Sequence, residues 1–339
     1  MNVFDERISR LQNQMKADNI KAYIIPSTDP HMSEECSSRF AAERFYFCPF
    51  KGMDGTLLVT QDHYYIYTDG RYWTEAKGDI KGTGCTLVYM GKHGVPSMAE
   101  FIKENRLYPL GLDSSLFSLN ELRFFALDKN STIKRVSYRR FVANLPTLPK
   151  GKIWKVEDKY LSTTREERVN AIMKEVKQQG AEAIVVPLLD DIAYVLGYRG
   201  SDIPCTPVFY SYLYISSDNH ISLFIDMDKI PNDFPAEISV YPYDQFEDFL
   251  KQHEEVPTLI DPNKTNAFIC SILKRPVFRS SPVYYQKSVK GKAEIENTKE
   301  VQAIDGIAVL KLMKYIDDKI DTGTLNEENL AEYLELQRR

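Results

Sequence analysis

"DERISRLQNQMKADNIKAYIIPSTD" occupies residues 5–29, and "EERVNAIMKEVKQQGAEAIVVPLLD" occupies residues 166–190. The two stretches align without a gap, so that Pro26 pairs with Pro187 and most charged and apolar positions coincide. Solenoid proteins repeat units of roughly 20 to 45 residues, and the separation between these copies is much longer than that. The repeat therefore predicts two similar domains in tandem.

Each copy predicts a helix followed by a buried strand. The apolar residues of the first half recur every three or four positions and form one stripe on a helix of about four turns; they are Ile8, Leu11 and Met15 in the first copy and Val169, Ile172 and Val176 in the second. The runs "AYIIP" and "AIVVP" that follow are almost continuously apolar and end in proline. This composition is typical of a strand that is buried on both faces.

The repeat continues beyond these first units. "DHYYIYTDGRY" at residues 62–72 resembles "NHISLFIDMDK" at residues 219–229, and a strand-like run precedes each of them across a polar turn. Such pairs of strands predict a central hairpin in each domain. A helical pattern and a short apolar run then follow in both copies. The sequence thus predicts two α/β domains with mixed sheets flanked by helices.

Two irregular stretches divide the chain. "ANLPTLPKGKIWKVEDKY" contains prolines and glycine without periodicity, and "RSSPVYYQKSVKGKAE" is expected to be a second irregular crossing. We therefore expect domains at 1–150 and 151–287, followed by a segment at 288–339. This last segment predicts a long amphipathic helix, whose apolar stripe comprises Ile295, Val301, Ile304, Ile307, Leu310, Met313 and Ile316.

Composition excludes several classes of protein. The chain has 339 residues, 43% of them hydrophobic, and a net charge of -5, which gives no general attraction to nucleic acid or acidic membranes. It contains no run of eighteen apolar residues and no secretory signal at its start, so we expect a cytoplasmic protein without a membrane partner. The five cysteines are dispersed, odd in number and never in a C-x-x-C pair, which argues against a disulfide framework or a thiolate zinc site. We expect them to be inert, partly buried thiols.

Three longer stretches carry a family resemblance. They are "AYIIPSTDPHMSE" (22–34), "YTDGRYWTEA" (67–76) and "LLDDIAYVLGYRGSDIPCTPVFYSYLYIS" (188–216), and "KGKAEIENTKEVQAI" follows them. In this order they resemble the three-domain cytosolic Xaa-Pro aminopeptidases of the creatinase and prolidase superfamily. The resemblance implies two tandem creatinase N-terminal-like domains, followed by the opening helices of a truncated "pita-bread" catalytic domain.

The resemblance also implies an activity for the parent protein. Family members are homodimeric metallopeptidases that remove the first residue from peptides with proline in the second position, using two divalent metal ions, here expected to be manganese. Their ligands are two aspartates, one histidine and two glutamates, none of which can be matched in this chain. The five histidines show neither an H-x-x-x-H nor an H-E-x-x-H pattern. We therefore expect no metal, no catalytic residue and no turnover in this chain alone.

Two other readings remain open. The parent could be a creatinase-fold protein without hydrolytic activity that acts as a binding or dimerisation module. The chain could also be a self-sufficient binding module that ends at Arg339.

Candidate site residues lie in two similar motifs. "TDGRY" places Asp69 and Arg71 directly after an apolar strand, where the resemblance implies that they face a substrate cleft. A strand-ending turn with an Asp–Arg pair would explain them equally well. "YRGSD" places Arg199 and Asp202 in a similar loop, for which we expect an interdomain role. A helix ending at a capping Gly200 is the alternative explanation.

A third motif and one departure concern the first domain. In "PSTDPHMSE" the resemblance implies that Glu34 approaches the active site of a neighbouring subunit, with His31 close by. A carboxylate there would select for the cationic α-amine of a substrate. Members of the family carry a "GFTGSAGT"-like stretch where this chain reads "CPFKGMDGT" at residues 48–56. Met53 and Asp54 replace small neutral residues in this loop, which would alter the fit of a substrate.

Overall fold

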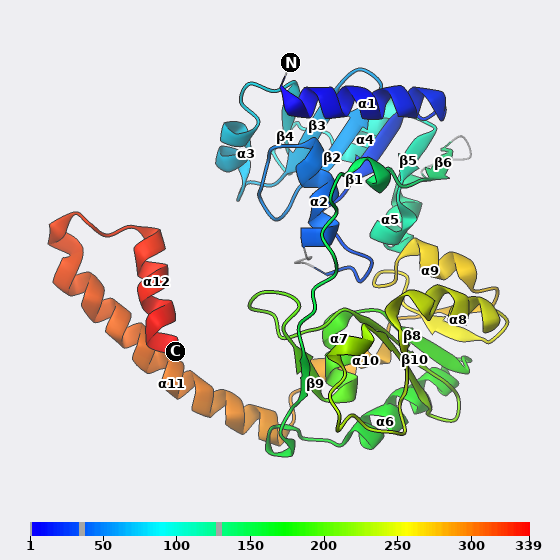
Figure 1. Cartoon of the computed structure of the whole chain (residues 1–339), viewed down its shortest axis with the longest axis vertical. Helices are drawn as coiled ribbons and strands as arrows, with labels where there is room; N and C mark the ends of the chain where they lie inside the picture. The colour runs from blue at the N-terminus through cyan, green and yellow to red at the C-terminus, as the bar shows by residue number, and fades with distance from the viewer. Residues whose placement is uncertain (1, 34–37, 127–130) are drawn as a thin grey trace.

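The computed structural model describes residues 2–33, 38–126 and 131–339. Two α/β domains lie one above the other in Figure 1, and a helical arm extends to one side of them. We call the unit built on the first sheet the first domain and the unit built on the second sheet the second domain.

The first domain contains a six-stranded mixed sheet with the order β4-β3-β2-β1-β5-β6. Its strands are β1 (Ala22–Ile25), β2 (Thr56–Thr60), β3 (Tyr64–Thr68), β4 (Cys85–Tyr89), β5 (Leu110–Leu112) and β6 (Ile133–Arg135). The β1–β2 and β2–β3 pairs are antiparallel, whereas β3–β4, β1–β5 and β5–β6 are parallel.

The second sheet has the same topology, with the order β12-β11-β10-β8-β13-β14. Its strands are β8 (Ala183–Val186), β10 (Ser211–Ile215), β11 (Ile221–Ile225), β12 (Ser239–Pro242), β13 (Thr258–Ile260) and β14 (Pro276–Phe278). The strand directions match those of the first sheet pair by pair. The predicted duplication and the predicted antiparallel hairpin in each domain are therefore confirmed.

The helices of the first domain begin with α1, which lies along the top of the sheet in Figure 1. Asn2 caps its first turn, and Ile8, Leu11 and Met15 are its buried residues, as the stripe in the sequence predicts. The helices are α1 (Val3–Ala17), α2 (Ser38–Phe47), α3 (Trp73–Asp79), α4 (Met98–Glu104) and α5 (Leu119–Phe125), with short 3-10 turns η1 (Ser114–Leu116) and η2 (Arg139–Phe141).

The second domain repeats this plan with its own helices. A reciprocal capping box between Thr164 and Glu167 starts the first of them. They are α6 (Arg165–Gln178), α7 (Leu189–Leu196), α8 (Phe246–Gln252) and α9 (Ala267–Ile272), with the 3-10 turns η3 (Asp158–Tyr160), η4 (Met227–Lys229) and η5 (Tyr243–Gln245). A separate antiparallel pair joins β7 (Ile153–Lys155) to β9 (Tyr198–Gly200).

The central strands β1 and β8 are buried on both faces. In β1, Tyr23 and Ile25 point into the core beneath α1, while Ala22 and Ile24 belong to the core on the opposite face. Because alternate side chains enter different cores, an uninterrupted apolar run is needed. This explains why the two most hydrophobic runs of the repeat became the central strands.

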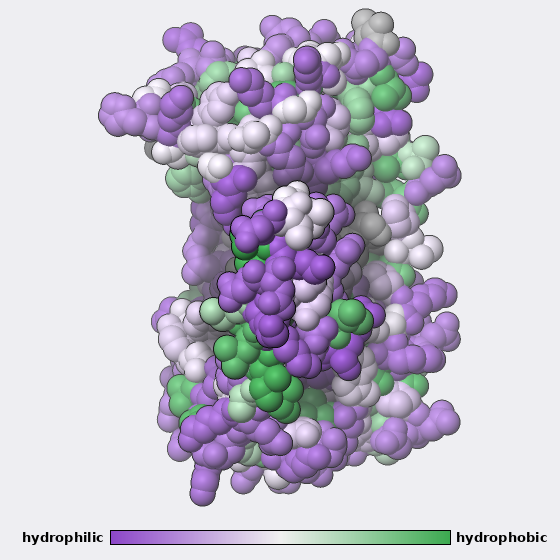
Figure 2. All heavy atoms as spheres, turned by 90° about the vertical axis from the view of Figure 1, so that its left-hand side faces the viewer, coloured by the Kyte–Doolittle hydropathy of each residue, from purple (hydrophilic) through white to green (hydrophobic). Residues whose placement is uncertain are grey.

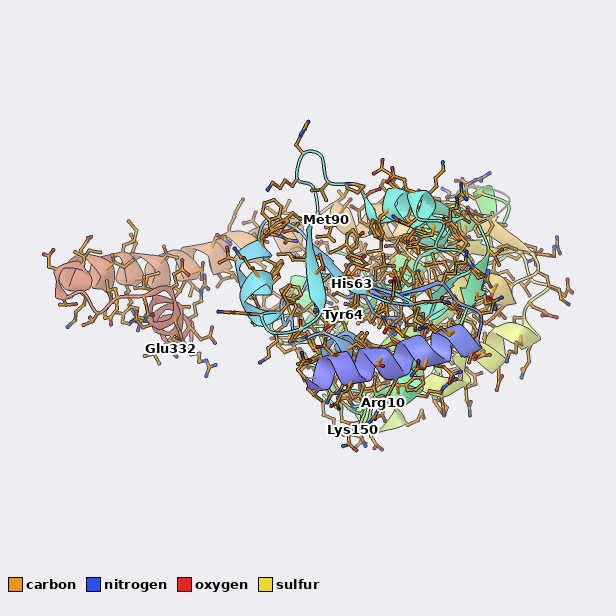
Figure 3. All side chains as sticks on the ribbon, turned by 90° about the horizontal axis from the view of Figure 1, so that it is seen from above. Arg10, His63, Tyr64, Met90, Lys150 and Glu332 are labelled. Atoms are coloured by element: carbon orange, nitrogen blue, oxygen red, sulfur yellow. The ribbon has the colours of Figure 1, made fainter. Side chains whose placement is uncertain are left out.

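The arm differs from the rest of the chain. It follows α10 (Pro282–Ser288), which occupies part of the stretch expected to be irregular, so that expectation was wrong. The arm consists of α11 (Lys292–Lys319), η6 (Ile320–Thr322) and α12 (Glu327–Arg338), and it projects from the two domains; Figure 3 labels Glu332 on α12. No helix in the described part of the chain is both long and apolar enough to cross a membrane.

The predicted apolar stripe on α11 is largely exposed. Ile304, Leu310 and Met313 are 64%, 65% and 56% exposed. Figure 2 views the molecule from the side on which the arm lies and shows green apolar patches within a mainly hydrophilic surface. The 28-residue helix α11 thus presents an apolar face that no described element covers.

Glu43 is a buried carboxyl group in α2. It accepts a hydrogen bond from the Tyr23 hydroxyl at 3.2 Å, and its Oε2 lies 3.9 Å from Nε of Arg139, beyond hydrogen-bonding distance. Burial raises the pKa of Glu43 to about 7, although the charge of Arg139 opposes this shift. The first domain therefore contains a carboxyl group that ionises near neutral pH.

We predict that Glu43→Gln makes the first domain more stable than wild type at pH 8 but not at pH 4.5. Because the folded-state pKa of Glu43 is raised, the native state binds the proton more tightly than the unfolded state does. The stabilisation that this proton gives the native state is complete below about pH 4.5 and is lost as the pH rises through 7. The difference should reach roughly 3 kcal/mol. Urea unfolding across this range measures it. Glu104→Gln, an exposed change in the same domain, should show no such trend.

Candidate functional site

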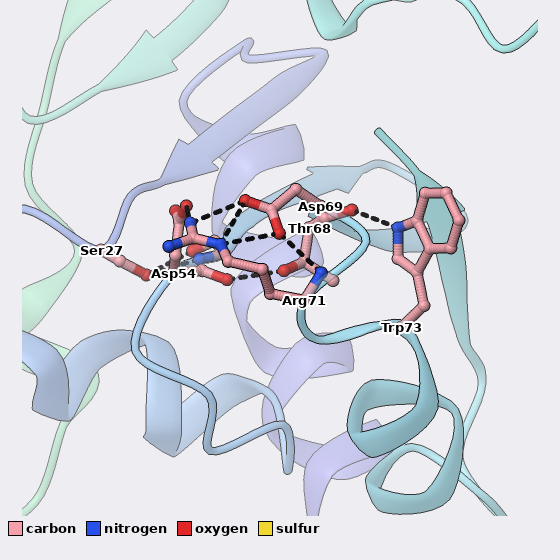
Figure 4. Close-up of polar contacts among 7 residues, drawn as sticks. Ser27, Asp54, Thr68, Asp69, Arg71 and Trp73 are labelled. Atoms are coloured by element: carbon pink, nitrogen blue, oxygen red, sulfur yellow. Dashed lines mark hydrogen bonds and ion pairs between the residues drawn. The ribbon is translucent and has the colours of Figure 1, made fainter. Parts of the chain in front are cut away.

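Arg71 forms the centre of a cluster with Asp54 and Asp69 (Figure 4), which we call the Arg71 cluster. Its Nε and Nη2 contact both oxygens of Asp69 at 2.7 to 3.1 Å, and Nη2 also donates to Asp54 Oδ2 at 3.0 Å. The backbone N–H of Arg71 donates to Asp69 Oδ1 at 2.9 Å, which closes an Asx turn at the end of β3. The structure therefore contains both the turn and the ion pair.

The loop that carries Asp54 is bonded to the ends of β1 and β3, and a further bond from Trp73 braces the end of β3. Thr68 Oγ1 donates to the carbonyl of Asp54 at 2.7 Å, and the Ser27 hydroxyl donates to the carbonyl of Gly55. Trp73 Nε1 donates to the carbonyl of Thr68 at 2.9 Å. These bonds, drawn in Figure 4, hold the loop against the carboxyl ends of β1 and β3.

The charge of Arg71 is already balanced within the cluster. Its side chain is 68% exposed, while those of Asp54 and Asp69 are 52% and 29% exposed. Hydrogen bonds from Arg71 lower the pKa of Asp69, so the Asp69 carboxylate stays ionised at neutral pH. A guanidinium shared by two carboxylates is poorly suited to attract a further anion, but it is well suited to fix the position of a loop.

A cavity of about 740 Å³ lies beside this cluster, and we call it the larger cavity. Asp54 is one of its lining residues, and the second domain contributes Asn263 and Lys264. Most of the remaining surface is apolar and includes Tyr67, Met90, Met98, Phe117, Phe124 and Phe125. An apolar chamber with a few charged groups is a typical binding site for an organic ligand.

His31 lies between the two domains and is fully buried. Its Nδ1 is 2.7 Å from the carbonyl oxygen of Pro187, which only accepts, so Nδ1 carries the hydrogen. In the neutral ring Nε2 then accepts from the hydroxyl of Tyr243, also at 2.7 Å. The imidazole packs against the rings of Tyr210 and Tyr212 as well. Burial lowers the pKa of His31, although the charge of Asp29 opposes this shift.

Asp29 holds the His31 loop in this position. Its Oδ1 accepts from the backbone N–H groups of His31 and Ser33, while Oδ2 accepts from the hydroxyl of Tyr210 at 2.9 Å. From the second domain, Asn266 Nδ2 donates to the carbonyl of Pro30 at 2.7 Å. We call this set of contacts around Asp29 and His31 the interdomain contact.

A smaller cavity of about 460 Å³ borders the interdomain contact. His31, Met32 and Ser33 line one side of it, while Lys264 and Lys287 supply positive charge. Met32 and Lys264 line the larger cavity as well. The two cavities therefore share a wall at the junction of the domains.

Arg199 supports the end of a helix. Its Nη1 donates to the carbonyl of Ala193 in α7 at 3.1 Å and to that of Tyr198 at 2.9 Å. Burial lowers the pKa of Arg199. The glycine that caps α7 is Gly197, in the left-handed conformation, and not Gly200, which lies in β9. Our explanation of Gly200 as a helix cap is therefore wrong.

Asp202 lies in the core of the second domain. Its carboxylate forms a buried ion pair with Lys229, and both side chains are almost completely inaccessible. It also accepts from the backbone N–H groups of Tyr210 at 2.7 Å and Gly151 at 3.1 Å. Asp202 thus connects η4, the start of β10 and the segment that leads out of the first domain, whereas Arg199 points to α7.

Glu34 lies outside the described residues. Within residues 2–33, 38–126 and 131–339, no three side chains of His, Cys, Asp and Glu come together as a set that would fit a metal ion.

Sequence reasoning missed Asp29 and Lys264 as parts of the site, and it treated Asp54 only as a departure in a loop. Asp29 follows a strand-ending proline in "PSTDP", which is a typical position for a side chain that organises a turn. Nothing in the sequence around Lys264 indicates that it reaches the first domain, because that depends on how the domains pack.

These features define a class of protein: two duplicated α/β domains joined through a buried loop, with cavities at their junction and an apolar helical arm. Models of the creatinase/prolidase N-terminal domain match residues 7–137 and again residues 144–294. The chain belongs to the creatinase/prolidase N-terminal domain family, of which it contains two copies.

Comparisons over the whole chain agree. Xaa-Pro aminopeptidase 1 of Dictyostelium discoideum is 28% identical over 365 residues, which cover 98% of this chain and 57% of that protein. Aminopeptidase P2 of Arabidopsis thaliana is 28% identical over 98% of this chain and 54% of its own length. A solved structure of X-prolyl aminopeptidase from Caenorhabditis elegans, a cytosolic enzyme with a di-nuclear active site, has a TM-score of 0.88. Its sequence is 23% identical, and the match covers 98% of this chain and 59% of that one. The chain thus spans little more than half the length of these relatives.

We predict that Asp202→Ala destabilises the second domain by about 3–5 kcal/mol, because Lys229 would remain buried without its counter-charge. Chemical denaturation measures this loss. Glu237→Ala, which removes the exposed partner of Arg165, is the matched control and should cost less than about 1 kcal/mol. Similar losses for both variants would contradict the structural role assigned to Asp202.

Acidification should weaken the interdomain contact. Because the folded-state pKa of His31 is lowered, the unfolded chain binds the proton more readily than the folded chain does. The contribution of His31 to the free energy of unfolding is therefore complete above about pH 6.5 and decreases as the pH falls below that value. We expect wild type to lose more stability between pH 7 and 5 than His31→Gln does. His220→Gln, at an exposed histidine, is the control and should behave like wild type.

Proposed function

We propose that this chain forms the amino-terminal, non-catalytic part of a metal-dependent Xaa-Pro aminopeptidase, which removes the first residue of peptides with proline in the second position. The main support is that relatives with this name align with 98% of the chain. We further propose the division into a first domain at 1–150, a second at 151–287, and the opening helices of a catalytic domain at 288–339.

We propose that the metal centre of such an enzyme is built from residues other than the described residues of this chain. The structural relative has a di-nuclear active site. The described residues of this chain do not fit such a centre, because they provide no cluster of three ligands. We propose that the whole protein uses two divalent ions, manganese by preference.

We propose that the first domain borders the substrate channel. The larger cavity supports this idea because it is mainly apolar, lies at the domain junction and has Asp54 at its wall. In this role Arg71 is a positioning residue that fixes the Asp54 loop through the Arg71 cluster. Glu34 remains a proposed contact to substrate, and Arg199 and Asp202 are proposed to support the interdomain arrangement.

The assembly and compartment of the protein are also proposals. The related worm protein is a cytosolic enzyme, and we propose a cytoplasmic location for this one. We propose a homodimer of the whole protein, in which the two front domains support association and control access to the cleft. Sedimentation of the whole protein would measure the number of subunits.

An assay with a peptide that begins Arg-Pro-Pro tests the main proposal. With added manganese, the 339-residue chain alone should release no arginine, whereas the chain extended by the segment that follows in its relatives should release it. Release by the chain alone would contradict the non-catalytic assignment. No release by a folded, metal-loaded extended protein would favour a binding or dimerisation module.

We predict that Arg71→Ala lowers kcat/KM of the extended enzyme at least about tenfold, or roughly 1.4 kcal/mol, because the loop at the larger cavity loses its anchor. Thermal stability should change little, since the side chain is 68% exposed. Lys274→Ala is the matched control. Lys274 also pairs with two carboxylates, Glu254 and Glu255, but it belongs to the second domain and does not line the larger cavity. Lower stability with unchanged kinetics would favour a role confined to the turn.

A further inference from the structure

Lys264 is an exposed residue in the wall that the two cavities share. It is the only cation among the described residues that line the larger cavity. Within the described part of the chain its ammonium group has no carboxylate partner, and Nζ lies 5.8 Å from the ring centroid of Tyr284. An ammonium group carries three hydrogen-bond donors, so Lys264 is able to bind an anionic group of a ligand.

The other cation in these walls is already paired. Lys287 lines the smaller cavity, and its ammonium group donates to Asp190 and also to Asp191, the latter at 2.6 Å. Glu121, a carboxylate in the wall of the larger cavity, accepts a backbone N–H at 2.7 Å in the capping box of α5. Lys264 is therefore the cation that remains available to a ligand at the junction of the two domains.

The Arg71 cluster gives another part of the larger cavity a negative charge. The cluster contains two carboxylates, Asp54 and Asp69, but only one guanidinium group, so one negative charge remains. Asp54 lines the cavity, and like charges repel each other more strongly beside an apolar wall than in water. An anionic group of a ligand is therefore disfavoured near Asp54 and favoured near Lys264.

The backbone on both sides of Lys264 is bonded to the first domain. The carbonyl of Pro262 accepts from the N–H of Asn120 at 3.0 Å. The carbonyl of Thr265 accepts from the N–H of Leu119 at 3.2 Å, and the residue after Thr265 belongs to the interdomain contact. Because these bonds hold the backbone of Lys264 at the cavity wall, less ordering is needed when a ligand binds.

We propose that Lys264 binds the terminal carboxylate of a short peptide that lies in the larger cavity. This inference rests on the proposed aminopeptidase function, which makes peptides the ligands of the cavity.

The cavity has the chemistry that such a ligand requires. Its mainly apolar lining accepts a proline ring or an aliphatic side chain, and the ammonium group of Lys264 donates charge-assisted hydrogen bonds to a carboxylate. An amidated peptide has no negative charge at this end. The site therefore selects peptides that have a free carboxylate and are short enough for it to reach Lys264.

Kinetics of the extended, metal-loaded protein with Arg-Pro-Pro and with its C-terminal amide test the proposal. Wild type should have a kcat/KM about fivefold higher for the free acid, mainly through a lower KM, because the exposed charge pair is made on binding. Lys264→Met should abolish this preference, whereas Lys264→Arg should retain it. Lys150→Met, which removes an exposed lysine that lines neither cavity, is the matched control and should behave like wild type.

Two kinetic results would overturn the proposal: equal kcat/KM for both peptides in wild type, or a preference for the free acid that persists in Lys264→Met. If the extended protein cleaves neither peptide, the proposed function fails, and calorimetric titration of the 339-residue chain with the same two peptides decides the role of Lys264 separately. The free acid should then bind more tightly than the amide, and Lys264→Met should remove the difference. Equal binding of both peptides, or binding of neither, contradicts the proposal.

Discussion

The insertion of His31 from the first domain between tyrosine rings of the second is the interaction on which the site depends. It is a buried polar contact, in which the ring satisfies both nitrogens through Pro187 and Tyr243. A buried hydrogen bond of this type contributes modestly when it is made and costs more when one partner is removed. Both cavities lie where this loop brings the two domains together. Without the loop, the Arg71 cluster would remain intact, but Lys264 would have no fixed relation to it.

The duplicated fold could be predicted from the sequence because the patterns that indicate it are local. The stripe Ile8, Leu11 and Met15 gives the buried face of α1, and the apolar runs give the central strands. These patterns follow from helix and strand periodicity, which every copy of the unit must satisfy. The helix α10 was missed, since seven residues that begin with proline provide too little periodicity to distinguish a helix from a turn.

The candidate site could be predicted only in part, for a different reason. Motifs identified the loops, and the structure shows that "TDGRY" and the departing "CPFKGMDGT" stretch meet at Arg71. Similar motifs nevertheless have different structural roles: Arg71 binds two exposed carboxylates, whereas Asp202 of "YRGSD" forms a buried pair with Lys229. Burial and partner are properties of the packed domain, and a short motif contains neither. The same limit explains why Asp29 and Lys264 were missed.

The segment 48–56 connects these observations. It begins at Cys48, which is buried in the core beneath α1, and six residues later Asp54 binds Arg71 at the wall of the larger cavity. Strand β4 runs from Cys85 toward Met90, which lines the same cavity. The core beneath α1, to which Cys48 and Cys85 belong, therefore supports a loop and a strand that both end at this cavity. Because a packed interior has low compressibility, a change of side-chain volume in this core would displace both the loop and the strand at the cavity wall.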